Sequence, residues 1–151
     1  MQRKSPQILI TGIGNPIRSD DGIGPYICGE MEKLKLAGVT TAIYHQLHTE
    51  LAEEFLKYDY VIVADAAVEG DTVTFYPLTG EKINPVSSSH HVNASLLVSL
   101  ARQLYNKELS IFICSVRGEN FEIGESLSVE AKNNADQAIS IIINWVSAQN
   151  A

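Results

Sequence analysis

The sequence has few cysteines and few basic residues, and each of these features argues against certain classes of protein. Its two cysteines, Cys28 and Cys114, are too few for a disulfide framework and are typical of a reducing compartment, so we expect a cytoplasmic protein. The 11 Lys and Arg residues against 18 Asp and Glu residues give a net charge of -7. That sign disfavours nucleic acid and anionic membranes as partners.

Long apolar runs, internal repeats and low-complexity tracts are also absent from the sequence. A membrane span needs about 20 consecutive apolar residues, and no run reaches that length. The basic N-terminal segment breaks into glycines after a short apolar stretch, which is not typical of a signal peptide. The length of 151 residues predicts one domain, residues 1–151, large enough to bury a core.

Apolar patterns of strand and helix type alternate along the chain. Strands are predicted at residues 8–13, 40–46, 60–64, 72–76 and 109–116. Helices are predicted from about residues 20–25 to Gly38, after a Thr49 cap, from Asn93 onward, and after a Ser126 or Ser128 cap. The alternation predicts an α/β fold, a three-layer α/β/α sandwich with a mostly parallel sheet. Residues 72–76 are the expected antiparallel exception, because only a hairpin-length turn separates them from the strand before.

A glycine-rich loop, GIGNPIRSDDGIG, follows the first strand. Gly12 and Gly14 suggest a dinucleotide site, but the third glycine of that fingerprint is missing. Asp20 and Asp21 at the helix entrance would also repel a pyrophosphate, so nucleotide binding is disfavoured. The glycines permit a tight turn, and the two aspartates are either helix caps or functional carboxylates.

Polar residues near other strand ends supply further candidates. Asp65 follows the central strand and is either a turn residue bonded to nearby backbone or a functional carboxylate. His90 and His91 precede the third helix, where extended backbone would point them in opposite directions, so at most one serves a given site. His48, near the end of the second strand, is a weaker candidate. Two Asp and one His suit an open site for Zn, Ni or Mn, or acid–base catalysis without metal.

Covalent catalysis has little support in the sequence. Cys28 and Cys114 fall within apolar patterns and are expected to be small buried hydrophobic residues. No G-x-S-x-G segment marks a serine hydrolase. The lack of a Ser or Cys nucleophile favours attack by water if the protein is a hydrolase.

Three segments taken together resemble the hydrogenase maturation endopeptidase family. They are GIGNPIRSDDGIGP, VIVADA and SSHHVNASLLVSLA, at residues 12–25, 61–66 and 88–101. A fourth segment, VRGENFEIGESLS, is similar to the family's loop before the final helix. The order is that of the family across nearly the whole chain, and it implies a three-layer α/β sandwich around a mixed five-stranded sheet.

The resemblance also implies a function and a set of site residues. Members of the family remove a short C-terminal extension from the precursor of the nickel–iron hydrogenase large subunit once nickel has been inserted. The precursor would then be the partner, and its nickel the metal at the site. Asp21, Asp65 and His90 are the implied metal-binding and catalytic residues, with His91 as the alternative to His90. A different class of function also remains, a non-catalytic assembly factor that binds the nickel site of the large subunit.

Overall fold

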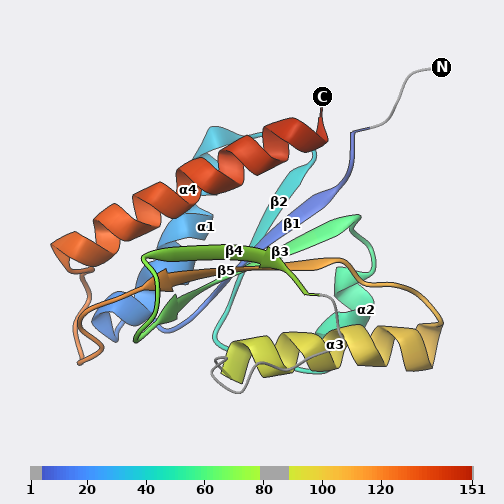
Figure 1. The fold of residues 1–151 in the computed structure, drawn as a ribbon, viewed down its shortest axis with the longest axis horizontal. Coiled ribbons are helices and arrows are strands. Elements are labelled where there is room, and N and C mark those ends of the chain that lie inside the picture. Colours follow the sequence, from blue (N-terminus) through green and yellow to red (C-terminus); the bar gives the residue numbers. More distant parts are fainter. Residues whose placement is uncertain (1–4, 79–88, 151) are drawn as a thin grey trace.

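The protein forms a five-stranded sheet with helices on both faces (Figure 1). The structure is a computed structural model that describes residues 5–78 and 89–150, with only the backbone described for residues 89–92. The elements are β1 (Ile8–Ile13), the 3-10 turn η1 (Ser19–Gly22), α1 (Ile23–Leu34), β2 (Val39–Tyr44), α2 (Leu51–Phe55), β3 (Tyr60–Ala67), β4 (Val73–Pro77), α3 (Ser89–Tyr105), β5 (Ile111–Arg117) and α4 (Val129–Gln149). None of the helices described here is long and apolar enough to cross a membrane.

The sheet is mixed but mostly parallel, as predicted. Its strand order is β2-β1-β3-β5-β4, with β4 antiparallel to β5 and the other pairs parallel. The antiparallel direction of β4 is confirmed, but the expected hairpin with β3 is wrong. Both edges of β3 are occupied by β1 and β5, so β4 passes over to the outer edge of β5 and pairs Val73 with Val116.

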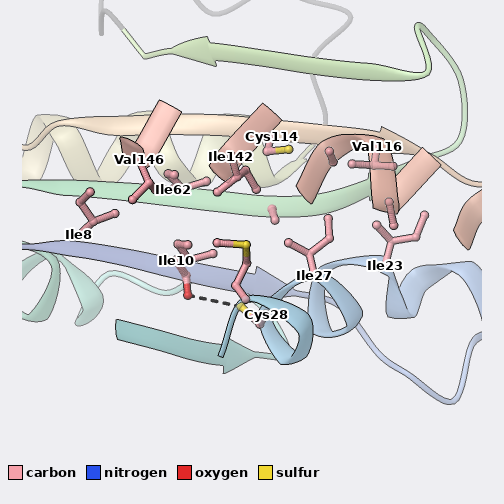
Figure 2. Packing of buried hydrophobic residues seen from close by; sticks show 14 of the residues in the cluster. Ile8, Ile10, Ile23, Ile27, Cys28, Ile62, Cys114, Val116, Ile142 and Val146 are labelled. Atoms are coloured by element: carbon pink, nitrogen blue, oxygen red, sulfur yellow. Dashed lines mark hydrogen bonds between the residues drawn. The ribbon is translucent and has the colours of Figure 1, made fainter. Parts of the chain in front are cut away.

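Two helices cover each face of the sheet, which gives the predicted three layers (Figure 1). On one face, α1 and α4 bury a cluster that contains Ile62 of β3 (Figure 2). On the other face, α2 and α3 bury a second cluster that contains Val61 and Val63. Because side chains alternate across a strand, Asp65 lies on the same face as Val61 and Val63, the face covered by α2 and α3.

Both cysteines lie in the first cluster, as predicted for small buried hydrophobic residues. The thiol of Cys28 donates a hydrogen bond to the carbonyl oxygen of Ile10 at 3.3 Å (Figure 2). Burial raises the pKa of Cys28 to about 12. Burial, together with the charge of Asp65, raises the pKa of Cys114 to about 12 as well. Neither thiol is therefore a nucleophile at neutral pH.

Several helix ends differ from the sequence predictions. Helix α1 ends at Leu34 rather than near Gly38, because Lys35 adopts a left-handed conformation with φ of 48°. Thr49 does not cap α2, whose N-cap position is Glu50. The cap of α4 is Ser128, one of the two serines predicted, and its side chain accepts from the Ala131 N–H at 3.2 Å.

Two elements near the predicted site also extend further than expected. Strand β3 continues to Ala67, so Asp65 lies within the strand and pairs in register with Ser115 rather than ending the strand. Helix α3 begins at Ser89 instead of Asn93. His90 and His91 are therefore part of a helical turn, and the expectation of extended backbone there is wrong.

Candidate active site

The loops that follow β1, β3 and β5 gather at one end of the sheet (Figure 1). The start of α1 approaches that end very closely, because it contains Gly24. A Cβ atom on Gly24 would lie 2.5 Å from the Ile13 oxygen and 2.6 Å from the Ala64 oxygen. The glycine thus allows the β1–α1 loop to lie against the carboxyl ends of β1 and β3, where ligands bind in open α/β sheets.

Asp21 is fixed on the β1–α1 loop by contacts within that loop. Its Oδ2 atom accepts from the Asn15 N–H at 2.8 Å, and its own N–H donates to the Arg18 oxygen at 3.1 Å. Gly14 has φ of 142°, and a Cβ there would lie 2.0 Å from the Asp21 oxygen. Gly14 is therefore required by both its backbone angle and its proximity to Asp21, which stays half-buried.

Asp65 lies inside β3 with 1% of its surface exposed. Burial raises the pKa of Asp65 to about 8, and the charge of Asp21 adds to that shift. Two acidic groups, one on the β1–α1 loop and one on β3, thus interact at the same end of the sheet, as predicted. A positive charge placed between them would favour the charged form of both carboxylates, so this pair of hard oxygen donors fits a cation.

Asp20 has a different environment from its neighbour Asp21. It is fully buried, and it accepts hydrogen bonds from the N–H groups of Glu119, Asn120 and Ser128 and from the Ser128 hydroxyl, at 2.7–2.8 Å. Burial alone would raise the pKa of Asp20, but these hydrogen bonds lower it overall. Asp20 is therefore a structural carboxylate that holds the loop of residues 118–128, and it caps neither η1 nor α1.

Tyr76 is a neighbour of the acidic pair that sequence reasoning missed. It lies on β4 and packs against the same cluster as Val61 and Val63. Burial raises the pKa of Tyr76, and the charge of Asp65 contributes to the shift. Strand β4 lies beyond β5 rather than beside β3, so the interaction between Tyr76 and Asp65 crosses β5.

The predicted histidines are placed only in part. His90 and His91 lie in the first turn of α3, the helix on the same face as Asp65, but their side chains are outside the described residues. Among the side chains that the structure does describe, no three His, Cys, Asp or Glu residues group closely enough to hold a metal. His48 is exposed and makes an edge contact with Tyr44, with ring centroids 6.3 Å apart. The histidine of the site stays a prediction.

Comparison with known proteins gives one similar sequence and several similar folds. No family model matches the chain. The chain is 29% identical over 154 residues to the "Putative hydrogenase maturation protease" of Methanocaldococcus jannaschii, an alignment that covers 95% of this chain and 98% of that protein.

Solved structures of similar fold include the hydrogenase maturating endopeptidase HybD from Escherichia coli. The TM-score is 0.77 at 20% identity, over 94% of this chain and 93% of HybD. The [NiFe] hydrogenase maturation protease HybD from Thermococcus kodakarensis gives 0.76 at 20% identity, over 93% and 99% of the two chains. The predicted fold is confirmed, and so is the resemblance to hydrogenase maturation endopeptidases.

Proposed function

We propose that this chain, similar in sequence and fold to hydrogenase maturation proteases, is an endopeptidase that removes the C-terminal extension of the nickel-loaded precursor of the nickel–iron hydrogenase large subunit. The observation that carries the proposal is the interaction of Asp21 with Asp65 at the carboxyl end of the sheet. The nickel is part of the substrate. The two free, buried cysteines support a cytoplasmic location for the reaction.

The acidic pair supplies a way to distinguish loaded from empty precursor. Without a cation, the charged form of Asp65 is disfavoured by its burial and by the nearby charge of Asp21. A nickel ion in the precursor would relieve both effects, so the loaded precursor gains binding energy that the empty one lacks. Asp21, Asp65 and either His90 or His91 are the proposed contacts to that ion.

Hydrolysis at this site needs water rather than a side-chain nucleophile. Both thiols are buried, and burial raises the pKa of each to about 12. A water molecule attacks the scissile carbonyl, and a carboxylate of the acidic pair accepts its proton. The same carboxyl group then gives that proton to the leaving nitrogen as the C–N bond breaks, which yields a new C-terminus and a free peptide. A metal ion beside the scissile bond would polarise the carbonyl.

The test is to incubate the purified protein with nickel-loaded precursor and to measure the mass of the product. We expect loss of the C-terminal peptide with the wild-type protein. We expect no cleavage with Asp21→Asn, Asp65→Asn or His90→Ala, and normal cleavage with Asp71→Asn, an exposed turn residue that serves as the control.

Three other results would change the assignment. Full processing by all three site variants would overturn these residue roles. Loss of activity in His91→Ala but not in His90→Ala would exchange the two histidines. A stable complex between wild-type protein and precursor without any change of mass would instead identify an assembly factor.

A further inference from the structure

Three aliphatic side chains are exposed on the loops at the site end of the sheet. Ile17, on the β1–α1 loop, is 56% exposed, and Val68, at the β3–β4 turn, is 74% exposed. Ile123, on the loop of residues 118–128, is 91% exposed. Exposed aliphatic residues on adjoining loops beside an active site are typical of a recognition surface.

The three loops are joined to one another by backbone hydrogen bonds. Ile17 accepts from the Gly124 N–H at 2.9 Å, and Gly124 in turn accepts from the Ser19 N–H at 2.8 Å. Ala67, next to Val68, accepts from the Gly118 N–H at 2.9 Å. The loop of residues 118–128 therefore contacts both of the other loops and fixes the backbone that carries all three side chains. A surface held this way loses little conformational entropy on binding.

Acidic residues outnumber basic ones around these side chains. Residues 14–22, 68–72 and 118–128 together contain seven Asp and Glu, against Arg18 alone among Lys and Arg. Glu119, Glu122 and Glu125 lie on the loop of residues 118–128, which contains no Lys or Arg. All three are exposed, and Glu119 has Arg117 at 3.6 Å as an ion-pair partner. A partner for this surface needs lysine or arginine side chains, and phosphate groups of nucleic acid or lipid would be repelled.

We propose that Ile17, Val68 and Ile123, together with Glu122 and Glu125, form a docking surface for the folded body of the precursor. The complementary surface on the precursor is an apolar depression bordered by Lys or Arg side chains. This inference rests on the proposed function and adds a contact remote from the scissile bond. The hydrogen bonds of Asp20 to Glu119, Asn120 and Ser128 connect the docking surface to the loop that carries Asp21.

The apolar part is tested by Ile123→Ser, with Leu104→Ser as the matched control. Leu104 is 68% exposed but lies near the end of α3, away from the three loops. Both positions are exposed, so neither change should unfold the protein. For Ile123→Ser we expect Kd and KM for nickel-loaded precursor to rise about tenfold with kcat within about twofold. For Leu104→Ser we expect wild-type values.

The charged part is tested by the double variant Glu122→Lys, Glu125→Lys, with exposed Glu53→Lys on α2 as the control. We expect about tenfold weaker binding of precursor at low salt, and a smaller difference at high salt, because salt screens exposed charges. Wild-type Kd for both Ile123→Ser and the double variant would overturn the docking surface, as would no binding of precursor by the wild-type protein. Tight binding without cleavage would contradict only the proposed protease activity.

Discussion

Asp20 and Ser128 share two hydrogen bonds although 108 positions separate them in the sequence. The Ser128 N–H donates to Oδ1 of Asp20 at 2.7 Å, and the Ser128 hydroxyl donates to Oδ2 at 2.8 Å. The same hydroxyl oxygen accepts from the Ala131 N–H at the start of α4. One buried carboxylate thus connects the loop of Asp21 to the cap of the last helix.

Replacing Asp20 by Asn should destabilise the protein by about 3 kcal/mol, because the amide NH2 would replace one carboxylate oxygen and point a donor at one or more of the donors that this oxygen accepts from. Hydrogen bonds lower the pKa of Asp20 below 3.8 despite its burial. Its contribution to stability is therefore complete above pH 3.8 and is lost as the pH falls through the folded-state pKa. Urea unfolding at pH 7 and in acid measures both effects. Asp71→Asn is the control, and equal stability of Asp20→Asn and wild type would contradict the prediction.

Replacing Asp65 by Asn should stabilise the metal-free protein while abolishing precursor cleavage. Burial and the charge of Asp21 raise the pKa of Asp65 from 3.8 to about 8. Between these values the folded chain binds a proton that the unfolded chain lacks, so this group's contribution to stability falls as pH rises. We expect a gain of about 2 kcal/mol for Asp65→Asn at pH 8, and a smaller gain at pH 5. Urea denaturation of both proteins at pH 5 and pH 8 measures the two differences in stability. A variant less stable than the wild-type protein at pH 8 would refute the prediction.

Two glycines of the same helix should respond oppositely to substitution by alanine. A Cβ on Gly24 would meet the carbonyl oxygens of Ile13 and Ala64 within 2.6 Å, so we expect Gly24→Ala to cost about 3 kcal/mol or more. A Cβ on Gly29 would meet nothing within 4 Å, and Gly29→Ala should gain about 0.5 kcal/mol from helix propensity. Thermal unfolding shows whether each variant is more or less stable than the wild-type protein. A lower Tm for Gly29→Ala than for Gly24→Ala would contradict the packing argument.

The thiols of Cys28 and Cys114 should not react with thiol reagents in the folded protein at pH 8. Burial raises the pKa of each to about 12, so about one thiol in ten thousand is ionised at that pH. Both should react quickly in urea, where the pKa returns to its ordinary value. Mass spectrometry after timed labelling measures the rates, and fast labelling of either cysteine without urea would show that the thiol is accessible.

The sequence predicted the sheet and the acidic pair because their signals are local. An apolar run such as residues 60–64 and a glycine loop such as residues 12–24 are visible without any knowledge of the rest of the chain. The position of Asp21 and Asp65 at one end of the sheet then followed from the parallel arrangement. The resemblance to a known family selected Asp21 over Asp20.

Other features depend on contacts between distant parts of the chain. Asp20 looked like a helix cap because its real partners, at residues 119–128, are about 100 positions away. The neighbours of β4 could not be predicted from turn length, since a short turn favours a hairpin and only competition for the edge of β3 decides against it. Tyr76 was missed because its interaction with Asp65 crosses β5.

The strand order has a consequence for how the protein is made. Strand β4 leaves the ribosome before β5, yet within the described residues its only partner in the sheet is β5, whose other edge lies against β3. Until residues 111–117 emerge, β4 has no place in the sheet and one edge of β3 stays open. Because Asp20 also needs residues 119–128, a nascent chain cannot complete its active site until most of its length has been synthesised. Cleavage activity should therefore appear late in translation.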